Sequence, residues 1–303
     1  MFKYTLDNKR YHTLNYYLRN KFGKKVFKVP LDAGFGCPNN SKCIYCSNQS
    51  KSNIINSKDS IVEQFYNNVK VLEKKWPDSL YIAYFQTGTN TNCSRDSLEP
   101  LIEELLKIDN VVGISISTRP DSISEDIYNY LDDLNKRTFL TVELGLQSSN
   151  NDTLKYIKRG HTKEEFKECV DKLHKSNIFV VAHIINGLPN ETEEDMLNTI
   201  DFLNKLNIEG LKIHMLFIEK NTEIANMYLN NEFHLLEKDE YIDIVIKQLE
   251  RLDSKVVIER ITGDPVKENL IAPSWLLKKF VVLNDIDKEM ARRNTYQGIE
   301  KER

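Results

Sequence analysis

Short apolar segments recur along the first two thirds of the chain, each bounded by turn residues and separated from the next by a helical pattern. Six of them have the length and composition of buried strands. They are residues 24–31, 80–86, 111–117, 139–146, 178–185 and 210–217. Because strands that alternate with helices build parallel sheets, this pattern predicts an α/β fold with six strand–helix units.

The predicted helices between these strands have sequence signals for their first turns. Ser60, Thr162 and Thr192 each stand three residues before a carboxylate, which is the arrangement of a capping box. Pro30 removes one backbone donor at the end of the first strand, and an edge strand tolerates this loss. We therefore expect an open sheet with its first strand at one edge.

Polar or glycine-marked stretches directly follow five of the predicted strands. They are residues 37–46, 87–91, 118–121, 147–149 and 186–189. In a barrel of alternating strands and helices, the loops after the strands share one face, where such enzymes carry out their chemistry. The order of these stretches therefore predicts one assembled site.

The first of these stretches contains three of the five cysteines, Cys37, Cys43 and Cys46, at C-x5-C-x2-C spacing. Thiolates this close on one loop can converge on a metal centre. Structural zinc sites usually have four protein ligands, whereas three cysteines on a cubane iron–sulfur cluster leave one iron open. Iron–sulfur, zinc and mere packing all remain possible from the spacing. Disulfides do not fit an odd cysteine count, and Cys93 and Cys169 are predicted to pack as small hydrophobic residues.

Seven stretches, in one order, resemble the YtqA/YhcC-type group of the radical S-adenosylmethionine (SAM) enzymes, which is related to the radical SAM domain of the elongator catalytic subunit. They are residues 9–39, 84–91, 117–123, 143–162, 187–196, 261–265 and 272–298. Two positions depart from the group: the loop between the first two cysteines is shorter, and Phe217 replaces a frequent second histidine. The resemblance covers nearly the whole chain.

The resemblance implies a [4Fe–4S] cluster held by Cys37, Cys43 and Cys46, with SAM chelating the open iron and cleaved to a 5′-deoxyadenosyl radical. It also implies a partial (β/α)6 TIM-type barrel with a C-terminal α-rich extension. We assign residues 1–23 to an N-terminal arm, 24–222 to the barrel and 223–303 to the extension. The extension shows two helical patterns, at 236–252 and 272–293, and a short strand at 255–259.

Residues around the predicted loops are expected to contact the cofactors. They are Tyr45, Gly88, Thr89, Thr118, Arg119, Asp121, Glu143, Gln147, Ser148, Arg159, His161, His183 and His214. Gly88 and the E-x-G-x-Q-S pattern of residues 143–148 are assigned through the resemblance. A charge such as Glu143 inside an apolar strand must face a polar cavity or a partner. The alternatives are a simple turn at Gly88, a surface ion pair between Arg119 and Asp121, a plain helix cap after Arg159, and structural histidines.

Charge is unevenly distributed along the 303 residues, whose formal net charge is −3. Residues 1–28 carry eight Lys or Arg side chains against Asp7 alone, interleaved with tyrosines. Single-stranded RNA is bound by base stacking on aromatic rings beside cations that neutralise phosphates. Predicted RNA contacts are Tyr11, Lys21, Lys24, Lys25 and Lys279. The alternative is an amphipathic segment whose tyrosines cover the end of the barrel.

Two functions of different class fit these patterns. The first, implied by the resemblance, is a radical SAM enzyme that acts on tRNA and converts the wobble uridine side chain from 5-carboxymethylaminomethyl toward 5-aminomethyl. Its electron donor would be a flavodoxin or ferredoxin type protein. A variant of this function is a radical SAM enzyme with another substrate. The second is a non-catalytic, zinc-bearing RNA-binding protein. Without an apolar leader or a membrane-length apolar run, we expect a cytoplasmic protein with no membrane partner.

Overall fold

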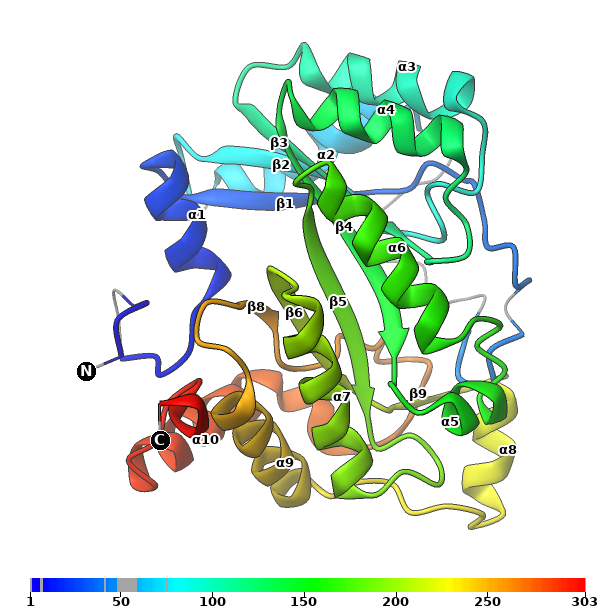
Figure 1. The fold of residues 1–303 in the computed structure, drawn as a ribbon, viewed down its shortest axis with the longest axis vertical. Helices are drawn as coiled ribbons and strands as arrows, with labels where there is room; N and C mark the ends of the chain where they lie inside the picture. The colour runs from blue at the N-terminus through cyan, green and yellow to red at the C-terminus, as the bar shows by residue number, and fades with distance from the viewer. Residues whose placement is uncertain (1, 6–7, 41, 48–58, 75, 303) are drawn as a thin grey trace.

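A seven-stranded parallel sheet forms the centre of the computed structural model, which describes residues 2–5, 8–40, 42–47, 59–74 and 76–302 (Figure 1). The strand order is β1-β2-β3-β4-β5-β6-β8. The strands are β1 (Val26–Leu31), β2 (Leu80–Phe85), β3 (Val111–Thr118), β4 (Phe139–Gln147), β5 (Phe179–Asn186), β6 (Gly210–Met215) and β8 (Val257–Arg260). Because neighbours in the sequence are neighbours in the sheet, all the loops that follow the strands meet at one edge.

All six predicted strands are present, within two residues at each end. Their α/β class and the curled, barrel-like sheet are confirmed. The seventh strand, β8, comes from the region predicted as an extension and pairs in parallel with β6. Pro30 lies on β1, which is an edge strand as predicted. The extension therefore completes the sheet instead of only covering it.

Helices on the outer side of the sheet separate successive strands (Figure 1). They are α2 (Ile61–Glu73), α3 (Arg95–Leu106), α4 (Glu125–Asn135), α6 (Lys163–Lys175) and α7 (Glu193–Leu206). The three predicted capping boxes are confirmed at Ser60, Thr162 and Thr192. In each, the hydroxyl accepts from a backbone N–H while the carboxylate returns to the cap, which satisfies two donors that the helix leaves free.

Side chains along β4 show how the sheet separates core from cavity. Leu140, Val142, Leu144 and Leu146 are fully buried in the main hydrophobic core. Since side chains alternate across a strand, the intervening Glu143 faces the concave side. The same alternation places polar residues of the other strands inside the curl. They are Lys28, Tyr84, Ser115, Ser117, His183, Lys212 and His214.

The two edge strands of the sheet approach each other across the concave side. Lys28 Nζ on β1 lies 2.6 Å from Glu259 Oε2 on β8, and the two side chains are 11% and 1% exposed. The main-chain N–H of Ile258 donates to His12 O at 2.7 Å, so the segment before α1 (Leu14–Phe22) lies beside β8. Side-chain and terminal contacts thus close a sheet whose edge strands do not pair with each other.

The remaining elements lie around the ends of the sheet. They are α5 (Asn151–Tyr156), β7 (Ile218–Glu219), α8 (Glu223–Leu229), α9 (Lys238–Arg251), β9 (Leu270–Ala272), η1 (Ser274–Lys278), α10 (Lys279–Arg292) and η2 (Ile299–Lys301). Gln297 is fully buried and bonds His12 N, Asp253 O and Val256 O. This amide therefore ties both chain termini to the sheet.

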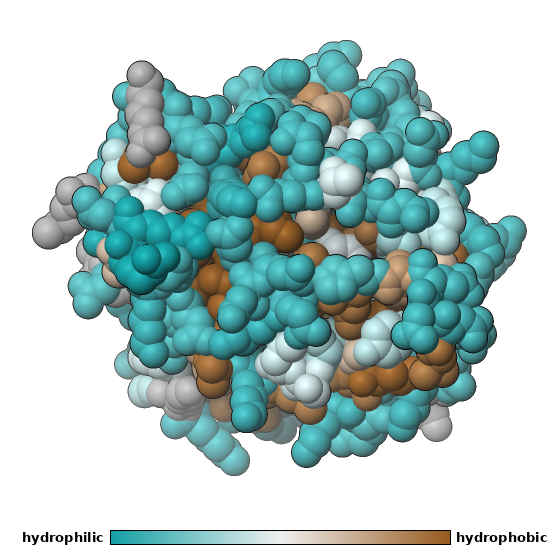
Figure 2. All heavy atoms as spheres, turned by 90° about the horizontal axis from the view of Figure 1, so that it is seen from below, coloured by the Kyte–Doolittle hydropathy of each residue, from teal (hydrophilic) through white to brown (hydrophobic). Residues whose placement is uncertain are grey.

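The outer surface is mainly polar. Figure 2 shows hydrophobic side chains in separate patches among polar ones on the face seen from below. Within the described ranges, no helix combines the length and apolar character that a bilayer span requires.

Gly113 in β3 allows the backbones of β3 and β4 to lie close together. A Cβ at this position would lie 2.6 Å from Phe139 O, a backbone atom of β4. We expect Gly113→Ala to lower the free energy of unfolding by about 2 kcal/mol, because strand backbones cannot separate without losing ladder bonds. Urea unfolding measures this loss. In the control Gly263→Ala, the added Cβ meets only side chains, at 3.2 Å or more, so a smaller loss is expected; equal losses would contradict the backbone explanation.

Candidate active site

The cysteine loop follows β1 and is supported by the loop after β2. Thr89 N donates to Gly36 O at 2.7 Å. A Cβ on Gly88 would lie 2.7 Å from the same carbonyl oxygen, and φ at Gly88 is +76°. Only glycine combines this left-handed conformation with so close an approach. The predicted residues Gly88 and Thr89 therefore contact the cysteine loop itself.

The far end of the cysteine loop lies between α5 and α8. Ile44 N donates to Ile157 O at 3.2 Å, and Ile224 N donates to Ile44 O at 3.0 Å. The Ile44 side chain is 2% exposed and packs in a small hydrophobic cluster with Ile157 and Ile224. Two segments that lie more than one hundred residues after the loop in the sequence thus hold it on both sides.

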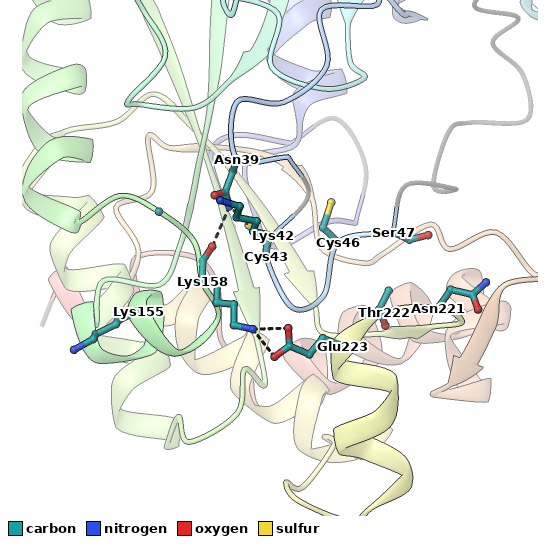
Figure 3. Close-up of a pocket in the computed structure, with 11 residues that line it drawn as sticks. Asn39, Lys42, Cys43, Cys46, Ser47, Lys155, Lys158, Asn221, Thr222 and Glu223 are labelled. Atoms are coloured by element: carbon teal, nitrogen blue, oxygen red, sulfur yellow. Dashed lines mark hydrogen bonds and ion pairs between the residues drawn. The ribbon is translucent and has the colours of Figure 1, made fainter.

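Two of the three cysteines line the larger of two pockets at this face, with a volume of about 880 Å³. Cys43 is buried, Cys46 is exposed and Cys37 is intermediate. In Figure 3, the pocket extends from the cysteine loop to α8, and Lys158 reaches across to Glu223. The lining residues are Asn39, Lys42, Cys43, Cys46, Ser47, Lys155, Lys158, Gly160, Asn221, Thr222 and Glu223.

Nitrogen donors surround the Cys43 sulfur. Asn39 Nδ2 lies 3.2 Å from Cys43 Sγ and also donates to Lys158 O. Arg159 Nη1 lies 3.9 Å from the same sulfur. The Tyr45 hydroxyl is buried beside Cys43, and burial raises its pKa. Asn39 and Arg159 therefore direct nitrogen donors at this sulfur.

Arg119, Asp121, Arg159 and His161, predicted from separate loops, form one cluster. Arg119 makes a two-point ion pair with Asp121, at 2.8 and 2.7 Å, and donates to Arg159 O at 2.9 Å. Arg159 Nη2 and His161 Nε2 both contact Gly145 O, at 2.8 and 3.0 Å. Burial, assisted by Arg159, lowers the pKa of His161 to about 4. His161 is therefore neutral at physiological pH.

Glu143 is the centre of a hydrogen-bonded network inside the curl of the sheet. Its carboxylate contacts six side chains from five other strands: Lys28, Tyr84, Ser115, Ser117, His183 and Lys212. Burial alone would raise the pKa of Glu143, but Lys212 and Lys28 hold it well below its ordinary value. The predicted polar lining is thus an ionised carboxylate between two lysines.

A second pocket, of about 270 Å³, lies between this network and the cysteine loop. His183 and His214 line it, with ring centroids 5.7 Å apart, and Gln147 and Cys46 contribute to the same wall. Burial lowers the pKa of both histidines. His183 Nε2 also lies 2.8 Å from a Glu143 oxygen. A ligand in this pocket would therefore meet neutral imidazoles backed by a charged network.

Two predicted cofactor residues have hydroxyls that are already hydrogen-bonded within the protein. Ser148 donates to Glu191 and accepts from Asn150 N. The Thr118 hydroxyl contacts that of Thr91 at 2.5 Å. These side chains organise the loops after β3 and β4, and their contact with a cofactor stays a prediction.

Comparison with known proteins decides what this site belongs to. Residues 33–203 match the Radical SAM superfamily, and residues 208–292 match the Radical_SAM C-terminal domain. YtqA of Bacillus subtilis is 42% identical over 98% of this chain and 94% of its own length. The chain belongs to the radical SAM superfamily. This superfamily uses a [4Fe–4S] cluster and SAM.

Two further relatives extend the comparison. The structure of Elp3 from Methanocaldococcus infernus superposes with a TM-score of 0.69 at 20% identity, over 90% of this chain and 64% of that one, which shows the shared fold. The tRNA-2-methylthio-N(6)-dimethylallyladenosine synthase of Fusobacterium nucleatum is 33% identical over 135 residues, or 44% of this chain and 31% of that enzyme.

The cysteine loop fits the cluster of this superfamily. Three thiols lie on one loop, donors face Cys43, and Cys43 and Cys46 border a pocket large enough for an inorganic cluster and a nucleoside. In the described part of the chain, no three His, Cys, Asp or Glu side chains converge as ligands of a single metal ion must. A cubane is larger than one ion, and its cysteines bind separate irons, so it does not need that convergence.

The structure corrects one predicted RNA contact of this radical SAM protein. Tyr11 is 5% exposed and packs in the main core, so its ring is not available for base stacking. Lys21 and Lys24 are exposed, but Lys25 lies over the rings of Phe27 and Trp76. Lys279 donates to Asp264 at 2.5 Å. Tyr11 therefore packs against the sheet, and RNA contact by the exposed Lys21 and Lys24 stays a prediction.

Sequence reasoning missed several residues of the site. Lys28 and Lys212 lie inside apolar strands, as Glu143 does, so the same signal would have found them. The sequence pattern instead places Lys28 among the eight basic residues of positions 1–28. Asn39 and Glu191 had no comparable signal, because polar residues are ordinary in loops. Cys169 is buried beside Tyr128, which agrees with its predicted packing role.

Glu191, which accepts from Ser148, makes stability depend on pH. Burial raises the pKa of Glu191 to about 7. In the folded protein Glu191 keeps its proton up to about pH 7, whereas in the unfolded chain it releases the proton near the ordinary pKa of a glutamate. The free energy of unfolding therefore falls as pH rises toward 7 and then levels off. Between pH 5 and pH 8, we expect the wild type to lose about 2 kcal/mol more than Glu191→Gln. Urea unfolding across this range measures the difference, and parallel profiles would contradict it.

Proposed function

We propose that this protein is a radical SAM enzyme that modifies tRNA, and that it converts the 5-carboxymethylaminomethyl side chain of wobble uridine toward 5-aminomethyl. The observation that carries the catalytic part is the cysteine loop, with three thiols beside a pocket and donors aimed at Cys43. Support for tRNA comes from the similarity of 44% of this chain to a tRNA-2-methylthio-N(6)-dimethylallyladenosine synthase. The wobble position itself rests on resemblance to the YtqA/YhcC-type group.

In this proposal, Cys37, Cys43 and Cys46 hold the cluster and leave one iron for SAM. When bound, the cluster supplies the electron that cleaves SAM to a 5′-deoxyadenosyl radical, and a flavodoxin or ferredoxin type protein supplies that electron. The protein's own residues position the reactants. Asn39 and Arg159 orient the Cys43 sulfur and offset negative charge on it. The loops after β2, β3 and β4 form the walls around this sulfur.

The smaller pocket fits a substrate side chain that contains both an amine and a carboxylate. It is lined by His183, His214 and Gln147 on the side away from the cysteine loop. Behind these residues, Lys212 and Glu143 form an ion pair that makes this wall of the pocket polar. Neutral His183 bonds Glu143 through Nε2, so its other ring nitrogen, Nδ1, can accept or return a proton.

Replacement of Cys43 tests the radical chemistry. We expect anaerobically reconstituted wild-type protein to contain close to four irons per chain and to release 5′-deoxyadenosine from SAM with a reductant. Cys43→Ala should lose at least a hundredfold of that release, because one iron lacks its protein ligand. The matched control is Cys93→Ala, at a free cysteine outside the loop. Zinc in place of iron in the wild type, without 5′-deoxyadenosine, would refute the enzyme proposal.

Modified nucleosides identify the substrate. We expect tRNA from cells that lack the gene to accumulate 5-carboxymethylaminomethyl uridines and to lose the 5-aminomethyl derivatives. Mass spectrometry of digested tRNA measures both. Complementation with the wild-type gene should restore the profile, and complementation with the Cys43→Ala variant should not. An unchanged profile, together with intact SAM cleavage, would reject tRNA and retain the radical chemistry.

A further inference from the structure

Three apolar side chains are exposed together around the start of α10. Phe280 is 71% exposed, and Leu277 and Val281 are each 46% exposed. Among the described residues, Phe280 is the most exposed large hydrophobic side chain. Large apolar side chains that gather on a surface mark a place where a partner binds, whereas single ones are ordinary. We call Leu277, Phe280 and Val281 the α10 patch.

The inner side of the same segment is held by the core. Leu276, Val282 and Ile286 are buried in the main hydrophobic cluster. Trp275 packs against Tyr241, with ring centroids 5.8 Å apart. Because these inward residues already fix η1 and α10, the α10 patch faces outward on a rigid support and is available to a partner.

The charges beside the α10 patch favour an anionic partner. In residues 277–288, the exposed charged side chains are Lys278 and Lys288. Neither lysine makes an ion pair with a carboxylate in the described part of the chain. The two carboxylates of this stretch, Asp285 and Asp287, are partly buried, and each pairs with a lysine from another segment. The exposed side of α10 is therefore apolar and positively charged.

The α10 patch begins next to the smaller pocket. A Cβ on Gly263 would lie 3.2 Å from a ring carbon of Phe217 and 3.4 Å from a methyl group of Leu276, so these two side chains are neighbours. Phe217 lines the smaller pocket, and Leu276 directly precedes the patch. A macromolecule bound on the patch is therefore close to the pocket that we assign to the substrate side chain.

We propose that the α10 patch is the docking surface for the unpaired loop of the RNA substrate, with Phe280 stacked on a base beside the modified one and Lys278 and Lys288 neutralising phosphates. This inference rests on the proposed function, which makes the substrate tRNA. A base that is bound in a confined pocket leaves the stack of its loop, so the neighbouring base loses a stacking partner. Aromatic rings beside lysines replace such a partner in proteins that bind single strands.

The ring of Phe280 is what favours RNA over an acidic protein. Aliphatic side chains alone would fit a protein equally well, but the most exposed member of the α10 patch is a planar ring. Lys279 Nζ lies 5.7 Å from the centroid of this ring and is held there by Asp264. A planar ring with cations around it, next to a pocket assigned to a uridine side chain, suits a base and its phosphates.

Binding of a synthetic anticodon stem–loop, with 5-carboxymethylaminomethyl uridine at the wobble position, tests the proposal on the reconstituted protein. Fluorescence anisotropy compares it with an RNA duplex that has no loop. We expect Phe280→Ala to weaken stem–loop binding about tenfold and to leave duplex binding unchanged, because one stacked base is lost. Phe280→Trp keeps a planar ring and should bind like the wild type, whereas Phe280→Leu should bind as weakly as Phe280→Ala. The control Tyr66→Ala removes an exposed ring on α2 and should change neither affinity.

The salt dependence of the same binding tests the phosphate contacts. Lys278→Gln should make the slope of log Kd against log salt concentration smaller by about 0.7, the value for one phosphate of a single strand. An unchanged slope would contradict the contact between Lys278 and a phosphate.

Three results would overturn the inference in different ways. Wild-type stem–loop affinity in Phe280→Ala, or equal wild-type affinity for stem–loop and duplex, would reject the stacking surface and leave tRNA modification standing. Weaker self-association or weaker flavodoxin binding in Phe280→Ala, with unchanged RNA affinity, would assign the α10 patch to a protein partner. A wild-type protein that binds neither the stem–loop nor whole tRNA would refute the substrate of the proposed function, and this inference with it.

Discussion

One buried carboxylate holds the concave side of this sheet together. Glu143 on β4 contacts side chains from β1, β2, β3, β5 and β6, and Lys28 continues from it to Glu259 on β8. A single carboxylate in such a place would be prohibitively costly, and so would a single lysine, because each charge would lose its water. Together they form a network in which removal of one member leaves the others uncompensated. The network gives the curl a defined width across strands that share no backbone pairing at its edges.

The position of this network determines where ligands can bind. It fills the middle of the curl with polar side chains and separates a pocket beside Lys28, Tyr84 and Glu259 from the two pockets toward the cysteine loop. The two pockets there share Cys46 and Ser47. A group bound at the cysteines is therefore adjacent both to the wide, lysine-lined pocket and to the narrow one between the histidines. This arrangement suits an enzyme in which a cofactor must lie between solvent and a confined substrate group.

Electrostatics differ between the two sides of the cysteine loop. On the side of the network, positive and negative charges are balanced by direct ion pairs. On the side of Arg119 and Arg159, one positive charge has no carboxylate partner among the described residues. Positive charge therefore lies beside Cys43 on this side of the loop. Superfamily membership identifies the cofactors, whereas these residues determine the environment that this particular chain provides for them.

The sequence by itself determined the strands, their order and the chemistry of the loop. Apolar segments of strand length, capping boxes and three closely spaced cysteines are local patterns, and local geometry controls them. It also indicated Glu143, since a charge in an apolar strand needs a partner. Only the tertiary structure decided which partner, because Lys28, Lys212 and Glu259 come from strands far apart in the chain. In the same way, the burial of Tyr11, the pairing of β8 with β6 and the contact of Arg159 with Cys43 depend on which segments pack side by side, and no periodicity within one segment records that.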